Sequence, residues 1–192
     1  MSDRRTAVIR YAPGAAAGVV AWVFGYLVTY FMTASDLRES SLNQFIELLD
    51  GQAATHELVG WVFFNAHFVD TVFQGLPVMG SRTATFIGGE DGFTVLLYLL
   101  PVGVLLAAGI SVARLSGAST PADGALAGAS TVLGYMLTTV VGVVAVEVTA
   151  GGASAGPEIV PALVIAGIAY PIVIGTAGGA LVGLTSPDRP LR

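Results

Sequence analysis

The chain has 192 residues, of which 54% are hydrophobic and 11% charged, and its mean hydropathy is +0.78. A soluble domain carries about a quarter charged residues, so this composition argues against a water-soluble globule. The absence of cysteine excludes disulfides, thiolate catalysis, iron–sulfur clusters and cysteine-ligated zinc. With a net charge of −5 and no cluster of bases, nucleic-acid binding is not expected either. The lipid bilayer is therefore the first expected partner.

The basic residues are unusual because all eight are arginine and none is lysine. The sequence pI lies near 4.8. Hydrated carboxylates keep proteins soluble in molar salt, where screening shortens the range of electrostatic forces. The composition therefore indicates a halophilic archaeon as the source.

Four long segments of the chain carry no charged residue. These segments are residues 11–35, 93–113, 124–146 and 159–185. Because a helix rises about 1.5 Å per residue, about 20 apolar residues cross a hydrocarbon core of about 30 Å. The sequence therefore predicts an all-α integral membrane protein, a four-helix bundle that forms a single membrane domain. The expected transmembrane spans are residues 13–33, 93–113, 124–148 and 159–184.

The arginines are distributed unevenly about these spans. With the N-terminus in the cytoplasm, the six expected inside are Arg4, Arg5, Arg10, Arg114, Arg189 and Arg192. Only Arg38 and Arg82 are then outside, which obeys the positive-inside rule. The same orientation places residues 34–92 outside, with eight acids and two bases. A multi-pass protein of the cell membrane with both termini cytoplasmic is expected.

Two alternatives to this topology stay open. Residues 58–73 are apolar and aromatic enough to suggest a fifth crossing, although they number only 16 and include Asn65 and His67. A fifth crossing would also divide the arginines evenly between the two sides. Arg4 and Arg5 precede an apolar stretch, as in an export signal, but the stretch is long and is interpreted as an uncleaved anchor.

The extracellular loop at residues 34–92 is expected to contain two amphipathic helices. Asp36 and Glu39 resemble a capping box, and apolar residues follow at helical spacing up to Gly51. A second helix is predicted over residues 57–74, with Thr55 as its N-cap. Its aromatic and aliphatic residues share one broad face. That helix is expected to lie flat at the membrane interface or over the outer mouth of the bundle.

Small residues four positions apart let helices approach closely in lipid. Glycines at this spacing are Gly14 with Gly18, Gly124 with Gly128, and Gly175 with Gly179 and Gly183. They predict tight packing within the chain, with contacts in a homo-oligomer as the alternative. Pro171 removes a backbone donor within the last span and predicts a hinge or a static bend.

Few groups in the sequence suggest chemistry. The candidate functional residues are Glu57, Trp61, Asn65, His67, Asp70 and Glu147. Glu147 is the one ionisable group near a span boundary, where it either reaches interfacial water or binds a cation or proton. His67 and Asp70 lie three apart, and a hydrogen bond between them that orients the loop is preferred over metal or acid–base work. No motif of a zinc protease or serine hydrolase occurs, so no metal, no cofactor and no enzyme activity are expected.

The segment at residues 60–70 reads GWVFFNAHFVD and stands between a first span and three glycine-rich spans. This layout resembles a family of uncharacterised small haloarchaeal membrane proteins that are commonly labelled as transporters. The resemblance implies a multi-pass membrane fold and offers no residue roles. In layout alone the chain is also similar to four-span tight-junction and large-pore channel proteins, whose disulfide-forming cysteines are absent here.

Two functions from different classes follow from these patterns. The first is transport or permeation of an unknown substrate along glycine-lined helices, with the outer helices over the mouth. The alternative is a structural or accessory protein of the archaeal cell envelope that binds an envelope protein through the external loop. A membrane enzyme ranks third, because it requires Glu57, His67, Asp70 and Glu147 to converge.

Overall fold

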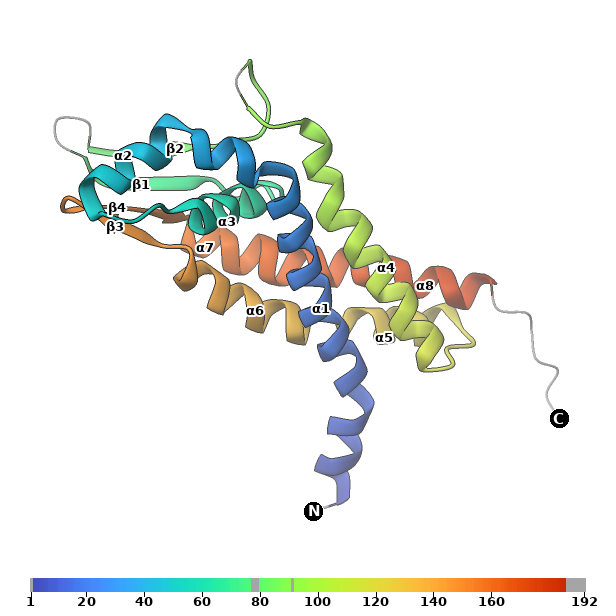
Figure 1. Ribbon diagram of the computed structural model, residues 1–192. Helices are drawn as coiled ribbons and strands as arrows, with labels where there is room; N and C mark the ends of the chain where they lie inside the picture. Colours follow the sequence, from blue (N-terminus) through green and yellow to red (C-terminus); the bar gives the residue numbers. More distant parts are fainter. Residues whose placement is uncertain (1, 77–79, 91, 186–192) are drawn as a thin grey trace, which may run out of the picture. The chain divides into compact units, whose positions relative to one another are not determined.

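A computed structural model describes residues 2–76, 80–90 and 92–185 of the chain (Figure 1). Four long helical segments are apolar enough to cross a membrane: Tyr11–Glu39, Val95–Leu115, Pro121–Ala145 and Ile159–Thr185. Between them the described residues form two short helices and four strands. The fold is therefore mostly helical, and the prediction of an all-α protein is wrong in part because a small antiparallel sheet is present.

The long segments are built from several elements. The first is α1 (Ser2–Glu39), and the second joins η1 (Val95–Tyr98) to α4 (Leu99–Leu115). The third joins α5 (Pro121–Ala129) to α6 (Val132–Ala145). The fourth consists of α7 (Ile159–Pro161), η2 (Ala162–Ala169), η3 (Pro171–Gly175) and α8 (Thr176–Thr185). The third helix thus ends at Ala145 and not at the predicted residue 148.

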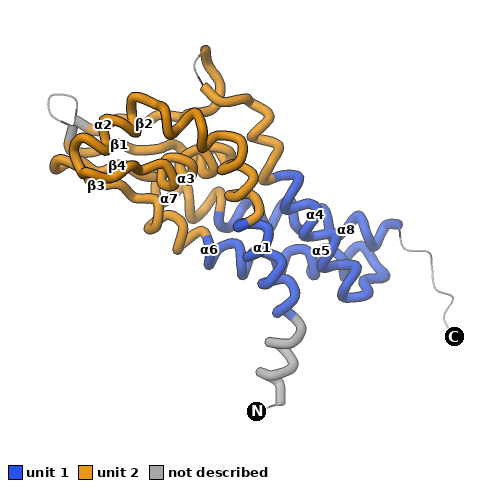
Figure 2. The backbone as a smooth tube through the Cα atoms, in the orientation of Figure 1, with its two compact units in different colours: residues 1–23, 102–138, 167–192 blue, residues 24–101, 139–166 orange. Residues whose placement is uncertain are grey.

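The chain packs as two compact units (Figure 2). The first, called the helical unit, comprises residues 1–23, 102–138 and 167–192. The second, called the loop unit, comprises residues 24–101 and 139–166 and contains both short helices and the whole sheet. Each unit is described by itself below.

In the helical unit, backbone lies directly against backbone. A β-carbon on Gly124 would collide with the carbonyl oxygen of Gly179, and one on Gly128 would collide with that of Gly175. Such contacts bring α5 against η3 and α8. Leu105 and Tyr135 form a small buried core with Ala21.

In the loop unit, two hairpins form one antiparallel sheet in the order β2-β1-β4-β3. The first hairpin is β1 (Thr71–Leu76) and β2 (Gly80–Ala84); the second is β3 (Val148–Ala150) and β4 (Ala153–Pro157). The central pair joins Thr71 to Pro157 and Gln74 to Ser154. Segments more than 70 residues apart in sequence are thereby held in one sheet.

The helix predicted over residues 57–74 is wrong in its second half. The observed α3 is Thr55–Asn65, and the sequence from Thr71 onward is strand β1. Hydrogen bonds to β4 outweigh the helical spacing of the apolar residues, because β-branched and aromatic side chains also suit a strand. With 11 residues, α3 is also too short for a fifth crossing.

The environment of α3 differs from the prediction as well. All residues from Leu58 to Asn65 are buried, so α3 is not an amphipathic helix lying flat at an interface. It packs against β1 and β4 within the loop unit. A helix that is apolar on every side is a core element, and the aromatic stretch forms the interior of this unit.

The predicted caps are replaced by neighbouring residues. Asp36 and Glu39 belong to the end of α1, while Ser40 caps α2 (Ser41–Asp50) by accepting a hydrogen bond from the Asn43 amide. Ala54, not Thr55, occupies the cap position of α3. The cytoplasmic C-terminus was predicted in part from Arg189 and Arg192, and these lie outside the described residues.

Candidate functional site

The loop unit is built around the aromatic side chains of α3. Trp61 is fully buried, and its indole N–H donates to the carbonyl of Val146 at 2.7 Å. Its ring meets Phe73 of β1 edge to face, with centroids 5.6 Å apart, and lies 6.1 Å from the ring of Phe86. Trp61 thus joins the loop at residues 34–92 and the loop between α6 and α7 in one core.

Asn65, at the end of α3, connects three segments of the first loop. Its side-chain nitrogen donates to the carbonyl of Val69 at 2.7 Å and lies 3.5 Å from the hydroxyl oxygen of Thr71. Its side-chain oxygen accepts the amide of Phe86 at 2.8 Å. Since buried polar groups must be paired, this amide side chain is a structural clamp.

His67 is completely buried, and its Nδ1 lies 2.9 Å from the carbonyl oxygen of Phe63. A carbonyl only accepts, so Nδ1 carries the proton of the neutral ring. Burial lowers the pKa of His67 to about 4, against a smaller opposing effect of the Phe63 carbonyl. The predicted hydrogen bond to Asp70 is wrong: the Asp70 side chain is exposed, and its backbone carbonyl accepts the amide of Glu158 at 2.9 Å.

A second polar clamp, Asn43 of α2, was missed by the sequence analysis. Its side-chain oxygen accepts the amide of Ala54 at 2.8 Å, and its nitrogen lies 3.4 Å from the Thr55 hydroxyl. The signal in the sequence was a polar residue within the apolar face between Leu42 and Ile46. An amide at a buried helical position indicates a fixed loop contact.

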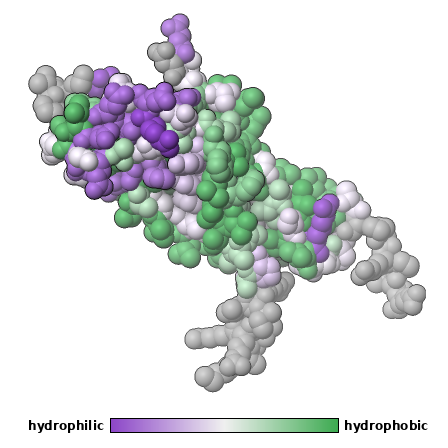
Figure 3. All heavy atoms as spheres, in the orientation of Figure 1, coloured by the Kyte–Doolittle hydropathy of each residue, from purple (hydrophilic) through white to green (hydrophobic). Residues whose placement is uncertain are grey.

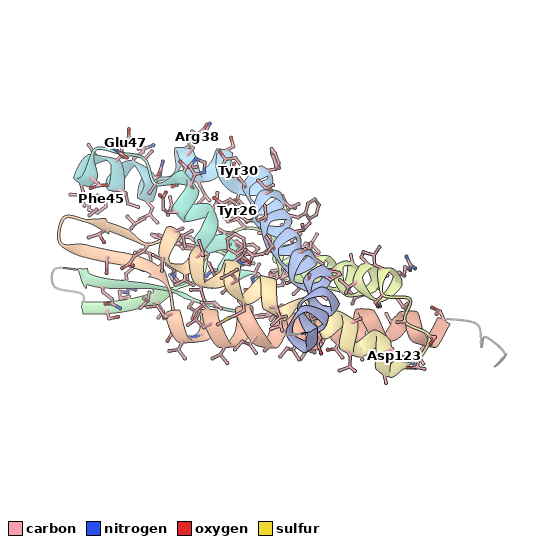
Figure 4. The ribbon with its side chains drawn as sticks, turned by 90° about the horizontal axis from the view of Figure 1, so that it is seen from below. Tyr26, Tyr30, Arg38, Phe45, Glu47 and Asp123 are labelled. Atoms are coloured by element: carbon pink, nitrogen blue, oxygen red, sulfur yellow. The ribbon has the colours of Figure 1, made fainter. Side chains whose placement is uncertain are left out.

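The tyrosines of α1 contact the start of α3. The Tyr26 hydroxyl donates to the carbonyl of His56 at 3.1 Å, and the Tyr30 ring stacks on the His56 ring with centroids 5.3 Å apart. Figure 4 labels both tyrosines on the side of α1 that faces α3. These contacts fix the C-terminal half of α1, which belongs to the loop unit, to the start of α3.

The predicted carboxylates do not converge. Glu57 is half-buried, while Asp70 and Glu147 are exposed. Glu147 follows the end of α6 and lines a cavity of 430 Å³ together with Glu158. In the described part of the chain, no three His, Asp or Glu residues gather as metal ligands. The arrangement required for an enzyme, with Glu57, His67, Asp70 and Glu147 together, is not observed there.

One exposed surface of the loop unit combines apolar and acidic groups. Phe45, Leu48 and Leu49 of α2, called the α2 ridge, are 55%, 85% and 48% exposed. Phe45 and Leu49 also line an apolar groove of 70 Å³ against β3 and β4. Figure 4 shows Phe45 and Glu47 on opposite faces of α2, and Figure 3 shows hydrophilic residues gathered over this end of the loop unit.

The predicted packing glycines lie in the helical unit. A β-carbon on Gly14 would collide with Ser130, one on Gly18 with Thr131, and one on Gly183 with Thr120. Pro171 begins η3, so the predicted hinge position lies in a π-helical stretch. A wider helical turn leaves backbone carbonyls less regularly paired.

The family comparison covers nearly the whole chain. A model described as a family of unknown function (DUF7978) matches residues 1–186. Neither the curated proteins nor the solved structures contain a match. The family description names no activity and no source organism, so the transporter and haloarchaeal labels stay predictions.

Proposed function

The chain belongs to the DUF7978 family, a family of unknown function, and for this member we propose an integral membrane protein that presents its loop unit to a protein partner. The observation that carries the proposal is the construction of the loop unit. Two separate loops form one sheet over a closed aromatic core, yet α2 keeps three large apolar side chains exposed. Exposed apolar clusters with a polar rim are typical of interaction surfaces.

The surface of the loop unit supports the membrane part of this proposal. The large apolar side chains exposed on α1, α6, α7 and η2 of this unit are Phe24, Leu27, Phe31, Met32, Val140, Val141, Val144, Ile159, Val160 and Val164. The exposed acids lie in the last turn of α1, on α2 or outside the helices, at Asp36, Glu39, Glu47, Asp50, Asp70, Glu90, Glu147 and Glu158. This separation suits helices in hydrocarbon whose loops are in water.

The α2 ridge also defines the chemistry of the partner. Acids flank these apolar side chains, because Glu47 lies on the face of α2 opposite Phe45, Asp50 ends α2 and Glu39 precedes it. A second copy of the chain would bring the same negative charges to such a contact. We therefore propose a partner with an apolar centre and an arginine- or lysine-bearing rim, because complementary charges favour association and like charges oppose it.

Topology is tested first, and the cysteine-free chain makes the test clean. Leu48→Cys and Asp123→Cys each place one thiol at an exposed position, on α2 and on α5. A membrane-impermeant maleimide added to intact cells is expected to label the first and not the second. Labelling of both, or of Asp123→Cys alone, would contradict four crossings with cytoplasmic termini.

Binding is tested by crosslinking in native membranes. A photoreactive residue at Leu48 is expected to give one defined adduct, and the matched control at Thr83, exposed on the far edge strand β2, is expected to give none. A Phe45→Asp substitution should abolish the adduct. Equal crosslinking from Leu48 and Thr83, or an adduct that survives Phe45→Asp, would reject the α2 ridge as the binding surface.

Transport is the second candidate function. It is favoured by the two π-helical segments Ala162–Ala169 and Pro171–Gly175 and by the buried Thr139 hydroxyl, which has no hydrogen-bond partner within the described residues. Both features are typical of helices that contact a translocated ion or solute. Reconstituted vesicles that show solute or ion flux above protein-free vesicles, reduced by Thr139→Val, would favour transport over the binding function.

A further inference from the structure

Phe68 is an exposed aromatic residue held in a left-handed backbone conformation. It is 63% exposed, and its φ is +59°, the only positive φ outside glycine among the described residues. The amide of Phe68 donates to the carbonyl of Asn65, and the amide of Val69 donates to that of Phe64. This is the pattern that closes a helix C-terminus, at a position where glycine is usual.

The backbone alone therefore does not explain phenylalanine at this position, because glycine would adopt the same φ without steric conflict. The side chain also contributes little to the core, since most of its surface is exposed. It stacks on Tyr98 with ring centroids 4.4 Å apart and planes 7° from parallel. A backbone conformation that is unfavourable for phenylalanine thus holds an aromatic ring on the surface.

The surroundings of this ring are apolar and continuous with a long apolar helix. Val95, Leu96 and Leu99 are 59%, 64% and 63% exposed and lie in η1 and the first turn of α4. These residues begin the apolar segment Val95–Leu115. Phe68, Tyr98, Val95, Leu96 and Leu99 are together called the interfacial patch.

The turn that carries Phe68 also lies at the end of the sheet from which the helices leave. Thr71 pairs with Pro157, and Asp70 accepts the amide of Glu158, the residue before α7. On the other side Thr71 pairs with Ala84, from which the chain leads to η1. The exposed carboxylates of Asp70 and Glu158 lie at the same end of the sheet.

We propose that the interfacial patch contacts the lipid bilayer, with Phe68 and Tyr98 at the boundary between headgroups and acyl chains. This inference rests on the membrane location in the proposed function and adds a position for the bilayer surface on the loop unit. Aromatic rings concentrate at that boundary, where an apolar body meets lipid while neighbouring polar groups remain hydrated. The turn between α3 and β1 then limits how far the loop unit stands from the membrane.

A spin-label experiment on the full chain tests the position of the patch. Single cysteines replace Phe68, Leu96, Leu48 or Phe24, and each protein carries a nitroxide in vesicles of phosphatidylcholine and phosphatidylglycerol. Collision rates with oxygen, which concentrates in lipid, are compared with those of a water-soluble nickel chelate. Leu96→Cys leaves the Phe68–Tyr98 stack intact, so it carries the test if Phe68→Cys fails to fold.

The proposal expects labels at Phe68 and Leu96 to favour oxygen, with a reversal of the ratio at Leu48, which is 85% exposed on α2. The label at Phe24, exposed on α1, reports the membrane location itself. If Phe24 favours oxygen while Phe68 and Leu96 favour the nickel chelate, the patch proposal is overturned and the membrane location stands. If both reagents are excluded at Phe68 and Leu96, protein covers the patch and the proposal is again overturned. If Phe24 also favours nickel, the proposed function itself fails.

Discussion

The two units of this protein differ in the size of the residues that make their closest contacts. In the helical unit, glycines remove side chains so that backbones touch, as at Gly124 and Gly179. In the loop unit, the core is built from large aromatic side chains that are fully buried, among them Trp61, Phe63 and Phe64. The Gly124–Gly179 contact joins two small residues, whereas the core around α3 joins large aromatic ones.

The difference fits the environments proposed for the packed segments, which are lipid for the helices of the helical unit and water for α2, α3 and the sheet of the loop unit. Lipid tails are as apolar as leucine, so burying large side chains gains little there, and close backbone contact and shape determine association. In water, aromatic burial removes much apolar surface and stabilises the core. The buried amides Asn43 and Asn65 have no counterpart among the described hydrogen bonds of the helical unit, where hydroxyls such as Thr138 bond to carbonyls of their own helix.

The largest effect is expected where a side chain is forced between two backbones. Gly179→Leu would place carbon atoms against the carbonyl of Gly124, which cannot move as a side chain can. Overpacking typically destabilises by about 1–3 kcal/mol, and a backbone collision lies at or above the top of that range. We expect a large drop in the thermal midpoint in detergent, or no folded protein.

Gly103→Leu is the matched control in the same unit. A β-carbon on Gly103 would have no described atom within 4 Å. Its thermal midpoint should stay close to that of the wild type. Equal losses in the two variants would mean that glycine content, and not the Gly124–Gly179 contact, stabilises the helical unit.

The loop unit should be most sensitive at a polar clamp. Asn65→Leu keeps the approximate volume but leaves the carbonyl of Val69 and the amide of Phe86 without their partner. Leaving these two buried polar groups without hydrogen bonds should lower the free energy of unfolding by about 3 kcal/mol. Gln44→Leu, at an exposed amide on α2, is the control and should change stability by less than about 0.5 kcal/mol. Thermal unfolding in detergent measures both; similar losses would show that Asn65 is not a clamp.

The long helices were predictable because hydrophobic length is a local property. An α-helix pairs all backbone groups within a charge-free run of more than 20 residues, which lipid requires. The observed segment Ile159–Thr185 matches the predicted one within one or two residues. The sheet was not predictable in this way. β1 exists because β4, contributed by the other loop, supplies its hydrogen bonds, and no local pattern in residues 71–76 encodes that partner.

The sequence analysis named Trp61 and Asn65 as candidate functional residues, and the contacts that the structure gives them are structural ones that build the loop unit. The pairing of His67 with Asp70 failed because the spacing of three assumed a continuous helix. The helix ends at Asn65 and the chain turns at the left-handed Phe68, so His67 is buried in the core and Asp70 is exposed. A single left-handed residue changes which side chains meet.

The buried histidine gives the loop unit a pH dependence. His67 has a pKa of about 4 in the folded protein and an ordinary value near 6.5 when unfolded, because burial disfavours the charged ring. The contribution of the neutral His67 to the free energy of unfolding is fully present above pH 6.5. It is lost as the pH falls toward 4, because in this range only the unfolded chain binds a proton at His67. Between pH 7 and pH 5 the loss should be about 2 kcal/mol.

The measurement is thermal stability against pH for the wild type and the His67→Gln variant. The variant should be less stable than the wild type at pH 7, but its stability should fall less between pH 7 and pH 5, because it lacks the buried imidazole. If wild type and His67→Gln lose stability in parallel between pH 7 and pH 5, the acid sensitivity belongs to other groups.

The smallest effect separates the backbone of Phe68 from its ring. Phe68→Ala keeps the left-handed strain at φ +59° and loses the stack on Tyr98, whereas Phe68→Gly loses the stack but removes the strain. The glycine variant should therefore be more stable than the alanine variant by about 1 kcal/mol in detergent. Against the wild type, the stacking lost in Phe68→Gly, about 0.5–1.5 kcal/mol, is offset by the strain that is released, so the two should lie close together. If the alanine variant is as stable as the glycine variant, residue 68 relaxes out of the left-handed conformation once the ring is removed. The backbone strain at Phe68 would then not exist, and an exposed phenylalanine at this position would need no special explanation.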